Sequence, residues 1–154
     1  MTPLVGEIIV PYDGLQEILA NTLGLTDTIG ESGLLVDLYQ NDYQPSPSTT
    51  AGAYDVCDFT GYASATVYGS QFLYPYLTGD GTAEADYANN PISWQNNGTT
   101  QAVYGYLVRS VSTGAVLWTA AWVSPVLLHH SEVLQFPLSI QDFGGVPDTE
   151  QNGG

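Results

Sequence analysis

The first 24 residues contain two different patterns of apolar positions, a short apolar run followed by a segment with helical spacing. Residues 4–10 are mostly apolar and stop at Pro11, which predicts a short strand. Residues 14–23 carry apolar side chains at helical spacing, and this pattern predicts a helix whose apolar stripe covers one face or end of a sheet. Asp13 is placed to cap that helix, and Gly24 is placed to end it in a left-handed conformation. The stripe consists of Leu15, Ile18, Leu19 and Leu23.

From residue 34 onward, apolar and polar positions alternate with period two, the pattern of half-buried strands. Pro137 falls within the last such segment and indicates a sheet edge or a bulge there. Two long polar stretches, 41–53 and 78–91, are expected to be loops. The predicted strands are 34–40, 59–68, 92–95, 102–111, 115–123 and 132–140.

The two strands on either side of Ser112-Thr113-Gly114 are predicted to form a hairpin, with Gly114 available for the left-handed turn position. Side chains two or four residues apart share one face of a strand. Two aromatic pairs are therefore each expected on one face: Tyr104 with Tyr106, and Trp118 with Trp122.

These elements predict an all-β fold, an antiparallel β-sandwich with jelly-roll or Greek-key connections and one short N-terminal helix. A single domain is expected to span residues 1–141. Residues 142–154 are rich in Gly, Pro and acidic residues, and we expect them to form a flexible C-terminal tail.

The charge composition excludes some classes of binding partner. The 154 residues include 16 acids but a single Lys or Arg, Arg109, so the formal net charge is −15. Nucleic-acid binding requires several basic side chains to displace counterions from phosphates, and binding to anionic membrane surfaces has a similar requirement. Both partner classes are therefore excluded, and we expect neither nucleic acid nor membrane as a partner.

No residue pattern points to a catalytic centre, and a non-enzymatic protein is predicted. Cys57 is the only cysteine, and the neighbouring Asp55 and Asp58 favour its protonated form. His129 and His130 are adjacent, so on a strand they point to opposite faces and do not chelate one metal. Paired carboxylates for glycoside hydrolysis remain an alternative, although no particular pair among the acids stands out.

The acids of the 78–91 segment are a candidate calcium site. Asp80, Glu84 and Asp86 supply carboxylates beside glycines, which calcium-binding loops favour. Their spacing departs from the EF-hand pattern, so a solvated loop is the favoured interpretation. We therefore assign no metal and no cofactor.

Three features are candidate partner-binding sites. The aromatic pair in Tyr74-Pro75-Tyr76 is hard to bury in a loop and suggests a contact surface. Arg109 is expected to pair with carboxylates, with a partner or carbohydrate contact as the alternative. The segment before the helix is suited to adding a strand to a partner's sheet, unless it completes the molecule's own sheet. Its candidate contact residues are Leu4, Val5, Ile8 and Ile9.

Four motifs occur in order along the chain. The first is a V-P-x-x-G opening before the helix. The second is an L-x-x-N-x-x-P turn, here one residue longer, and the third is D-F-T-G-Y-A. The fourth is a Y-G-Y-x-V strand followed by an L-L-W strand, with Val in place of the first Leu, that ends near a proline. The segments are Val10–Gly14, Leu38–Pro45, Asp58–Ala63, Tyr104–Val108, and Val116–Trp118 with Pro125.

Through these motifs the chain resembles, over about residues 10–125, a family of small virion-associated structural proteins encoded in tailed-phage genomes. Residues 71–91 and 141–154 fall outside the resemblance. It implies a virion component, and we expect a capsid cement or decoration protein. The expected partner is the major capsid protein on the outer surface of the head, and the expected state is a homo-oligomer, with a trimer favoured. The alternatives are a tail- or spike-associated glycan-binding module and a carbohydrate-active domain.

Overall fold

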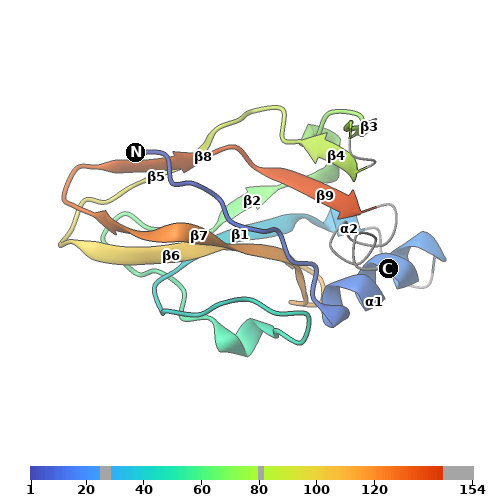
Figure 1. The fold of residues 1–154 in the computed structure, drawn as a ribbon, viewed down its shortest axis with the longest axis horizontal. Helices are drawn as coiled ribbons and strands as arrows, with labels where there is room; N and C mark the ends of the chain where they lie inside the picture. The colour runs from blue at the N-terminus through green and yellow to red at the C-terminus, as the bar shows by residue number, and fades with distance from the viewer. Residues whose placement is uncertain (25–28, 80–81, 144–154) are drawn as a thin grey trace.

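The computed structural model describes residues 1–24, 29–79 and 82–143, and Figure 1 shows its elements. Strands dominate, and every strand pair is antiparallel among the residues described. The elements are α1 (Tyr12–Thr22), α2 (Ile29–Ser32), β1 (Leu34–Tyr39), η1 (Ala51–Ala53), β2 (Ala65–Val67), η2 (Gly69–Gln71), β3 (Tyr76–Leu77), β4 (Thr82–Asp86), β5 (Ile92–Gln95), β6 (Gln101–Ser110), β7 (Val116–Leu128), β8 (Val133–Phe136) and β9 (Ser139–Phe143).

The strands form two layers. One is a four-stranded sheet in the order β2-β1-β6-β7. The other combines the β5–β8 pair with the three-stranded sheet β3-β4-β9, because the chain passes from β8 into β9 through Pro137. Figure 1 shows β8 and β9 running across from β6 and β7. The predicted all-β, sandwich-like fold is thereby confirmed.

Aromatic rings fill the space between the layers. Phe136 of β8 lies 4.7 Å from the ring of Tyr106 on β6 and 5.1 Å from Trp122 on β7. It also stacks on Trp94 of β5 at 5.9 Å. Trp118 and Trp122 both lie in this core, as predicted for one face of their strand. Burial of such large rings is a major stabilising contribution in a domain of this size.

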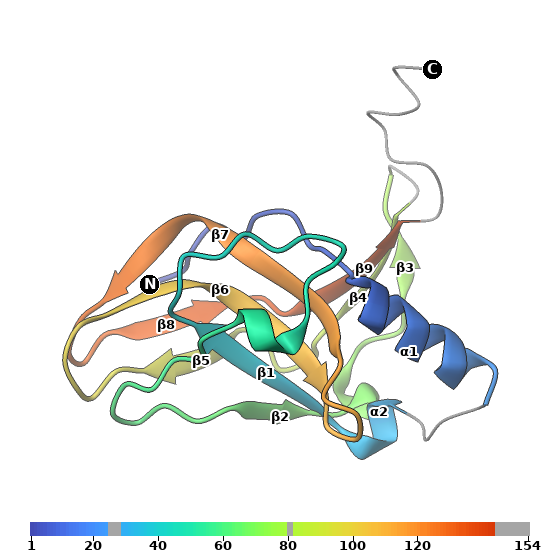
Figure 2. The ribbon, with the colours of Figure 1, turned by 90° about the horizontal axis from the view of Figure 1, so that it is seen from below.

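The loop between β1 and β2 covers the outer face of the four-stranded sheet (Figure 2). Tyr54 contributes an edge contact to Tyr39 at 4.8 Å, and its hydroxyl donates to Thr119 Oγ1 at 2.8 Å. Tyr104 packs in this second cluster, whereas Tyr106 lies in the main core. The prediction that these two tyrosines share a face is wrong, because a register shift after Val103 interrupts the alternation.

The N-terminal segment, predicted as strand 4–10, runs along the free edge of β7. The backbone N–H of Gly6 donates to Ala121 O at 2.8 Å, and Ile9 exchanges two backbone hydrogen bonds with Thr119. The pairing consists of isolated bridges rather than a continuous ladder. Of the two roles considered from sequence, the structure shows the segment completing the molecule's own sheet.

The helix occurs where the pattern predicts it, but it begins earlier and faces the other way. Its N-cap is Pro11, so Asp13 lies in the first turn and makes no cap hydrogen bond. Gly24 has φ of +71°, as predicted for the residue that ends the helix. Most of the leucine stripe faces solvent instead of the sheet, contrary to the prediction, and only Ile18 packs against the core.

Several predicted boundaries change. The segment 59–68 contributes only the short β2, and 115–123 extends to Leu128 as β7. The segment 132–140 divides at Pro137 into β8 and β9, in agreement with the predicted interruption. The stretch 78–91 was predicted to be a loop, but it contains β4 between β3 and β9. Strand β4 covers one end of the sandwich and is only partly buried, so it carries polar side chains that resemble those of a loop. The one-turn helix α2 had no sequence signal. The flexible tail was predicted from residue 142, but residues 142 and 143 belong to β9, and residues 144–154 lie outside the described residues.

Candidate functional site

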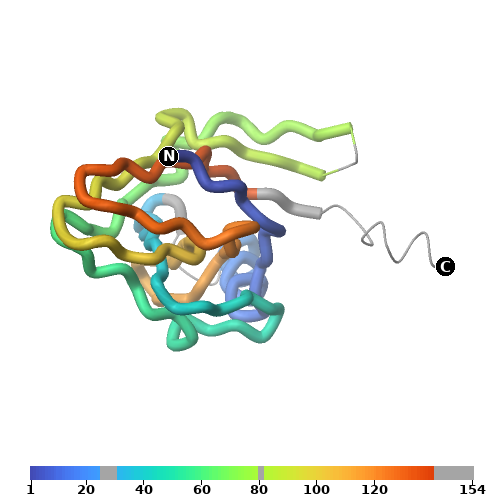
Figure 3. Tube along the Cα trace, turned by 60° about the vertical axis from the view of Figure 1, so that its left-hand side comes forward, coloured from blue at the N-terminus to red at the C-terminus, as the bar shows by residue number. Residues whose placement is uncertain are grey.

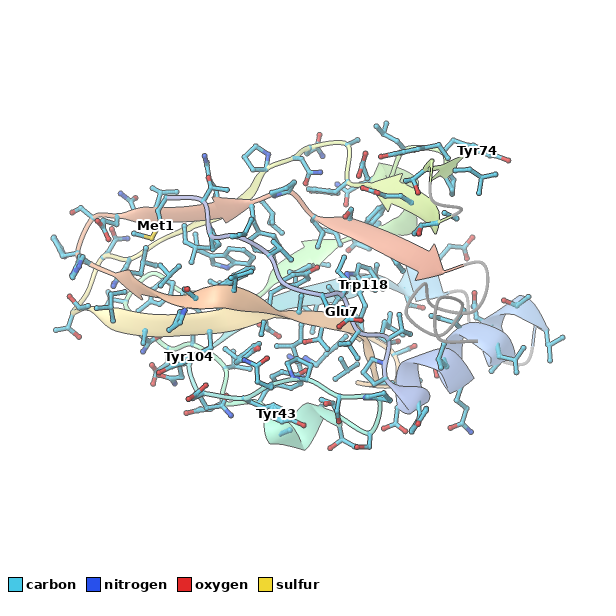
Figure 4. All side chains as sticks on the ribbon, in the orientation of Figure 1. Met1, Glu7, Tyr43, Tyr74, Tyr104 and Trp118 are labelled. Atoms are coloured by element: carbon cyan, nitrogen blue, oxygen red, sulfur yellow. The ribbon has the colours of Figure 1, made fainter. Side chains whose placement is uncertain are left out.

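The two most exposed large apolar side chains among the described residues lie at β3 and just before it. Tyr74 is 92% exposed and Leu77 is 77% exposed, and Leu73 and Tyr76 are also exposed. These four residues are termed the hairpin patch. Figure 3 shows the β3–β4 hairpin projecting from the body of the molecule, and Figure 4 shows Tyr74 at the rim. The contact surface predicted at Tyr74 and Tyr76 is therefore exposed.

The patch is anchored from one side. Phe72 points inward, with its ring 6.5 Å from Trp118 and 5.8 Å from Tyr87. The N–H of the next residue, Leu73, donates to Asp86 O at 2.8 Å. The chain thus passes from a core aromatic straight into exposed positions. Sequence reasoning singled out the tyrosines but missed the two leucines, although the apolar run around Pro75 carried that signal.

Strand β3 is an edge strand. It pairs only with β4 in its sheet, through Tyr76 opposite Glu84 and Leu77 opposite Ala83. An edge strand presents unpaired backbone groups to a partner, and exposed side chains beside it add contact area. This arrangement is chemically suited to binding a surface or an extended segment.

Carboxylates border the patch. The hydroxyl of Tyr76 donates to Asp86 Oδ2 at 3.2 Å. Desolvation, followed by the charges of Asp86 and Glu84, raises the pKa of Tyr76 above its ordinary value.

Arg109 is held inside the fold. Its Nη2 lies 2.5 Å from Oδ2 of Asp37, which is fully buried, while Arg109 itself is 28% exposed. Tyr62 donates to Asp37 Oδ1 at 2.8 Å, and Ser64 donates to the same oxygen. The predicted carboxylate pairing is confirmed. The ion pair with Asp37 already engages the guanidinium, which leaves less of it for a partner. A partner contact through Arg109 stays a prediction.

The predicted N-terminal contact residues have different environments. Val5 and Ile8 pack against the core, and Ile9 is partly buried. Leu4 is exposed, while its carbonyl accepts from the N–H of Val123 at 2.9 Å. One edge of this segment's backbone is therefore hydrogen-bonded to β7, and among the four candidate contact residues Leu4 is the exposed one. Their role in partner binding stays a prediction.

The histidines lie on the turn before β8. His129 Nδ1 lies 2.9 Å from Thr100 Oγ1, and His130 Nδ1 lies 3.2 Å from Gly98 O. Each ring is exposed and has its own neighbour, so the two imidazoles do not share a partner.

The remaining chemical candidates are separate. Burial first, and then the nearby Asp58 and Asp55 carboxylates, raise the pKa of the Cys57 thiol to about 12. Among the residues with defined positions, no group of three or more His, Cys, Asp or Glu side chains is placed to hold a metal ion. Asp80 of the candidate calcium loop lies outside them.

Over the described ranges, no helix has the length and apolar character needed to cross a membrane. No protein-family model matches this chain, and no curated protein is significantly similar to it.

Proposed function

We propose that this protein is a structural binding protein of a tailed-phage virion, a cement or decoration protein that attaches to the outer surface of the head shell. Its partner is the major capsid protein, and it acts as a homo-oligomer, with a trimer favoured. It is not an enzyme. The hairpin patch is the observation that carries the proposed binding role. The assignment to a phage head rests on the motif resemblance.

The hairpin patch supports a binding role because it exposes apolar side chains to water in the free protein, which is unfavourable. Monomeric proteins rarely leave several large apolar side chains exposed together without a contact to make. Tyrosine is enriched at interfaces, since its ring contributes area with few rotatable bonds. Tyr74 and Leu77 are both exposed on the projecting hairpin, so a partner surface covers them without rearrangement of the core.

Charge supports the same role. With a formal net charge of −15 and its only arginine paired to Asp37, the protein has little affinity for the nucleic acid packed in a head. A shell-binding protein benefits from this, because its binding is directed to protein rather than to DNA. The N-terminal segment pairs with β7 through isolated bridges, and its part in attachment stays a prediction.

The test is a decoration assay with purified protein and undecorated heads. The variant Tyr74→Ser/Leu77→Ser is expected to lose head binding by at least about tenfold while remaining folded. The matched control is Leu127→Ser, which alters an exposed leucine next to the last residue of β7. Figure 1 shows β3 at the opposite end of the molecule from the end of β7. Wild-type protein that fails to sediment with heads, or a double variant that binds as well as wild type, would contradict the proposal.

Quantitative mass spectrometry of virions locates the protein. A copy number comparable with that of the capsid subunits supports the head shell, whereas a few copies per particle place the protein on the tail.

A second candidate function is glycan binding. The ring of Tyr74 is open to solvent, and the hydroxyl of Tyr76 lies against Asp86, a combination of aromatic face and carboxylate that suits sugar recognition. Titration with bacterial surface polysaccharide distinguishes the two functions, since binding that Tyr74→Ser abolishes favours the glycan. Hydrolysis of the polysaccharide would instead show an enzyme.

A further inference from the structure

Helix α1 presents its apolar stripe to solvent. Tyr12, Leu15, Leu19 and Leu23 are all exposed, with Leu19 at 60% and Leu23 at 63%. They are spaced by three or four residues, so they form one line along the helix. In a surface helix of a globular protein this line ordinarily faces the core.

The face of α1 that packs on the sheet is the opposite one. A Cβ atom on Gly14 would lie 2.5 Å from Val116 O, so this glycine allows the helix to sit directly on the β7 backbone. One turn later, Glu17 is only 9% exposed, and its Oε1 has no hydrogen-bond partner. The fold therefore buries a carboxylate and leaves the leucines outside, an orientation that a partner covering the leucines would explain.

An apolar groove lies beside the stripe. It has a volume of about 260 Å³ and is lined mainly by apolar side chains, among them Ile18, Phe72, Leu117, Trp118 and Ile140. Thr22 of α1 also lines it, and Leu15 and Leu19 flank Ile18 and Thr22 on the helix surface. The stripe and the groove thus form one surface, termed the α1 surface. The groove is large enough for a single aromatic or branched aliphatic side chain.

The exposed charges near the α1 surface are negative and favour a positively charged occupant. Asp13 on α1 and Glu31 on α2 are exposed, and Figures 1 and 2 place both helices at the same end of the sandwich. The only arginine is bound to Asp37, and the amino group of Met1 donates to Val133 O. If a second copy docked through this same surface, it would place its own exposed Asp13 and Glu31 against these carboxylates, so the proposed homo-oligomer has to form through another surface.

We propose that the α1 surface binds a basic amphipathic segment of a partner protein, which lays its apolar face on the leucine stripe and inserts one large apolar side chain into the groove. Lysine or arginine residues flanking that face meet the acidic surroundings of α1. This surface is distinct from the hairpin patch, and the inference does not depend on the particle proposed above.

The test uses the full chain and two synthetic helical peptides. Both carry the same leucines and one phenylalanine at helical spacing, but one has lysine and the other has glutamate at every remaining position. The lysine peptide is expected to bind at least about tenfold more tightly near 0.05 M salt, with the difference shrinking near 0.5 M. Because Trp118 lines the groove, insertion of the phenylalanine is expected to change tryptophan fluorescence.

The double variant Leu15→Gln/Leu19→Gln is expected to weaken binding of the lysine peptide at least about tenfold with an unchanged melting temperature, since both residues are exposed and glutamine retains helix propensity. The control Tyr74→Ser/Leu77→Ser is expected to bind like wild type, which separates this inference from the proposed function. Equal affinity for both peptides, or no effect of the α1 variant, would overturn the inference. Sedimentation equilibrium tests the alternative occupant, a second copy. If the wild type is a dimer and the Leu15→Gln/Leu19→Gln variant is a monomer, the inference is overturned.

Discussion

Two antiparallel hairpins in this protein treat similar side chains in opposite ways. In the β6–β7 hairpin, Tyr106, Trp118 and Trp122 are almost completely buried. In and just before the β3–β4 hairpin, Tyr74 and Tyr76 are exposed, and Figure 4 shows the contrast between Trp118 inside the molecule and Tyr74 at its rim. The identity of an aromatic residue therefore does not decide its burial here.

The difference comes from the number of neighbours. Strand β6 has β1 on one side and β7 on the other, and both faces of its sheet are covered. Strand β3 has only β4 beside it. A central hairpin must bury its rings because chain surrounds it, whereas an edge hairpin has room to offer its rings to a partner.

The largest expected effect is at the centre of the buried hairpin. Trp122→Ala removes a ring that contacts Tyr106 and Phe136, and it should lower the free energy of unfolding by about 3–5 kcal/mol. Urea denaturation of variant and wild type measures this. A loss below about 1 kcal/mol would mean that the two layers do not depend on this contact.

The next effect concerns the polar link across β1 and β6. Arg109→Met leaves the Asp37 carboxylate buried without its cation, which should cost about 3 kcal/mol. The control Arg109→Lys retains a positive charge and should lose less. Equal stability of Arg109→Met and wild type would show that Tyr62 and Ser64 alone satisfy Asp37.

Alkaline pH should weaken the packed regions further. Burial raises the pKa values of Cys57 and Tyr54 to about 12, and it also raises those of Tyr39, Tyr62 and Tyr106. These groups stay protonated in the native state while the unfolded chain loses protons above about pH 9, so the free energy of unfolding falls as pH rises from there toward 12.

For Cys57 alone the expected loss between about pH 8 and pH 10 is about 1–2 kcal/mol. Urea titrations at several pH values measure the change, and Cys57→Ala should show a shallower decline than wild type. A decline that is just as steep in Cys57→Ala would contradict the contribution of the thiol.

The smallest expected effect is at the exposed hairpin. Tyr74→Ala and Leu77→Ser should each change the free energy of unfolding by no more than about 0.5 kcal/mol, because neither side chain is packed. The same urea measurement tests this. A cost near that of Trp122→Ala would show that the hairpin patch is part of the core and would remove the contrast between the two hairpins.

The local elements were predictable from sequence alone. Period-two alternation located β1, β5, β6 and β7, and the punctuating residues Gly24, Gly114 and Pro137 act where they were expected to act. The pairing of Arg109 with a carboxylate was also predictable, because it is the only fixed cation in a chain with 16 acids. Each of these inferences depends on neighbouring residues or on one chemical requirement.

The tertiary structure alone decided which faces are covered. The leucine stripe of α1 faces outward because Gly14 lets the opposite face approach β7, and no helical period encodes that choice. The N-terminal segment found its partner in β7, a strand more than a hundred residues away along the chain. Burial is a property of the assembled layers rather than of a segment, so the outward leucines of α1 and the edge position of β3 became visible only once the strands were placed beside one another.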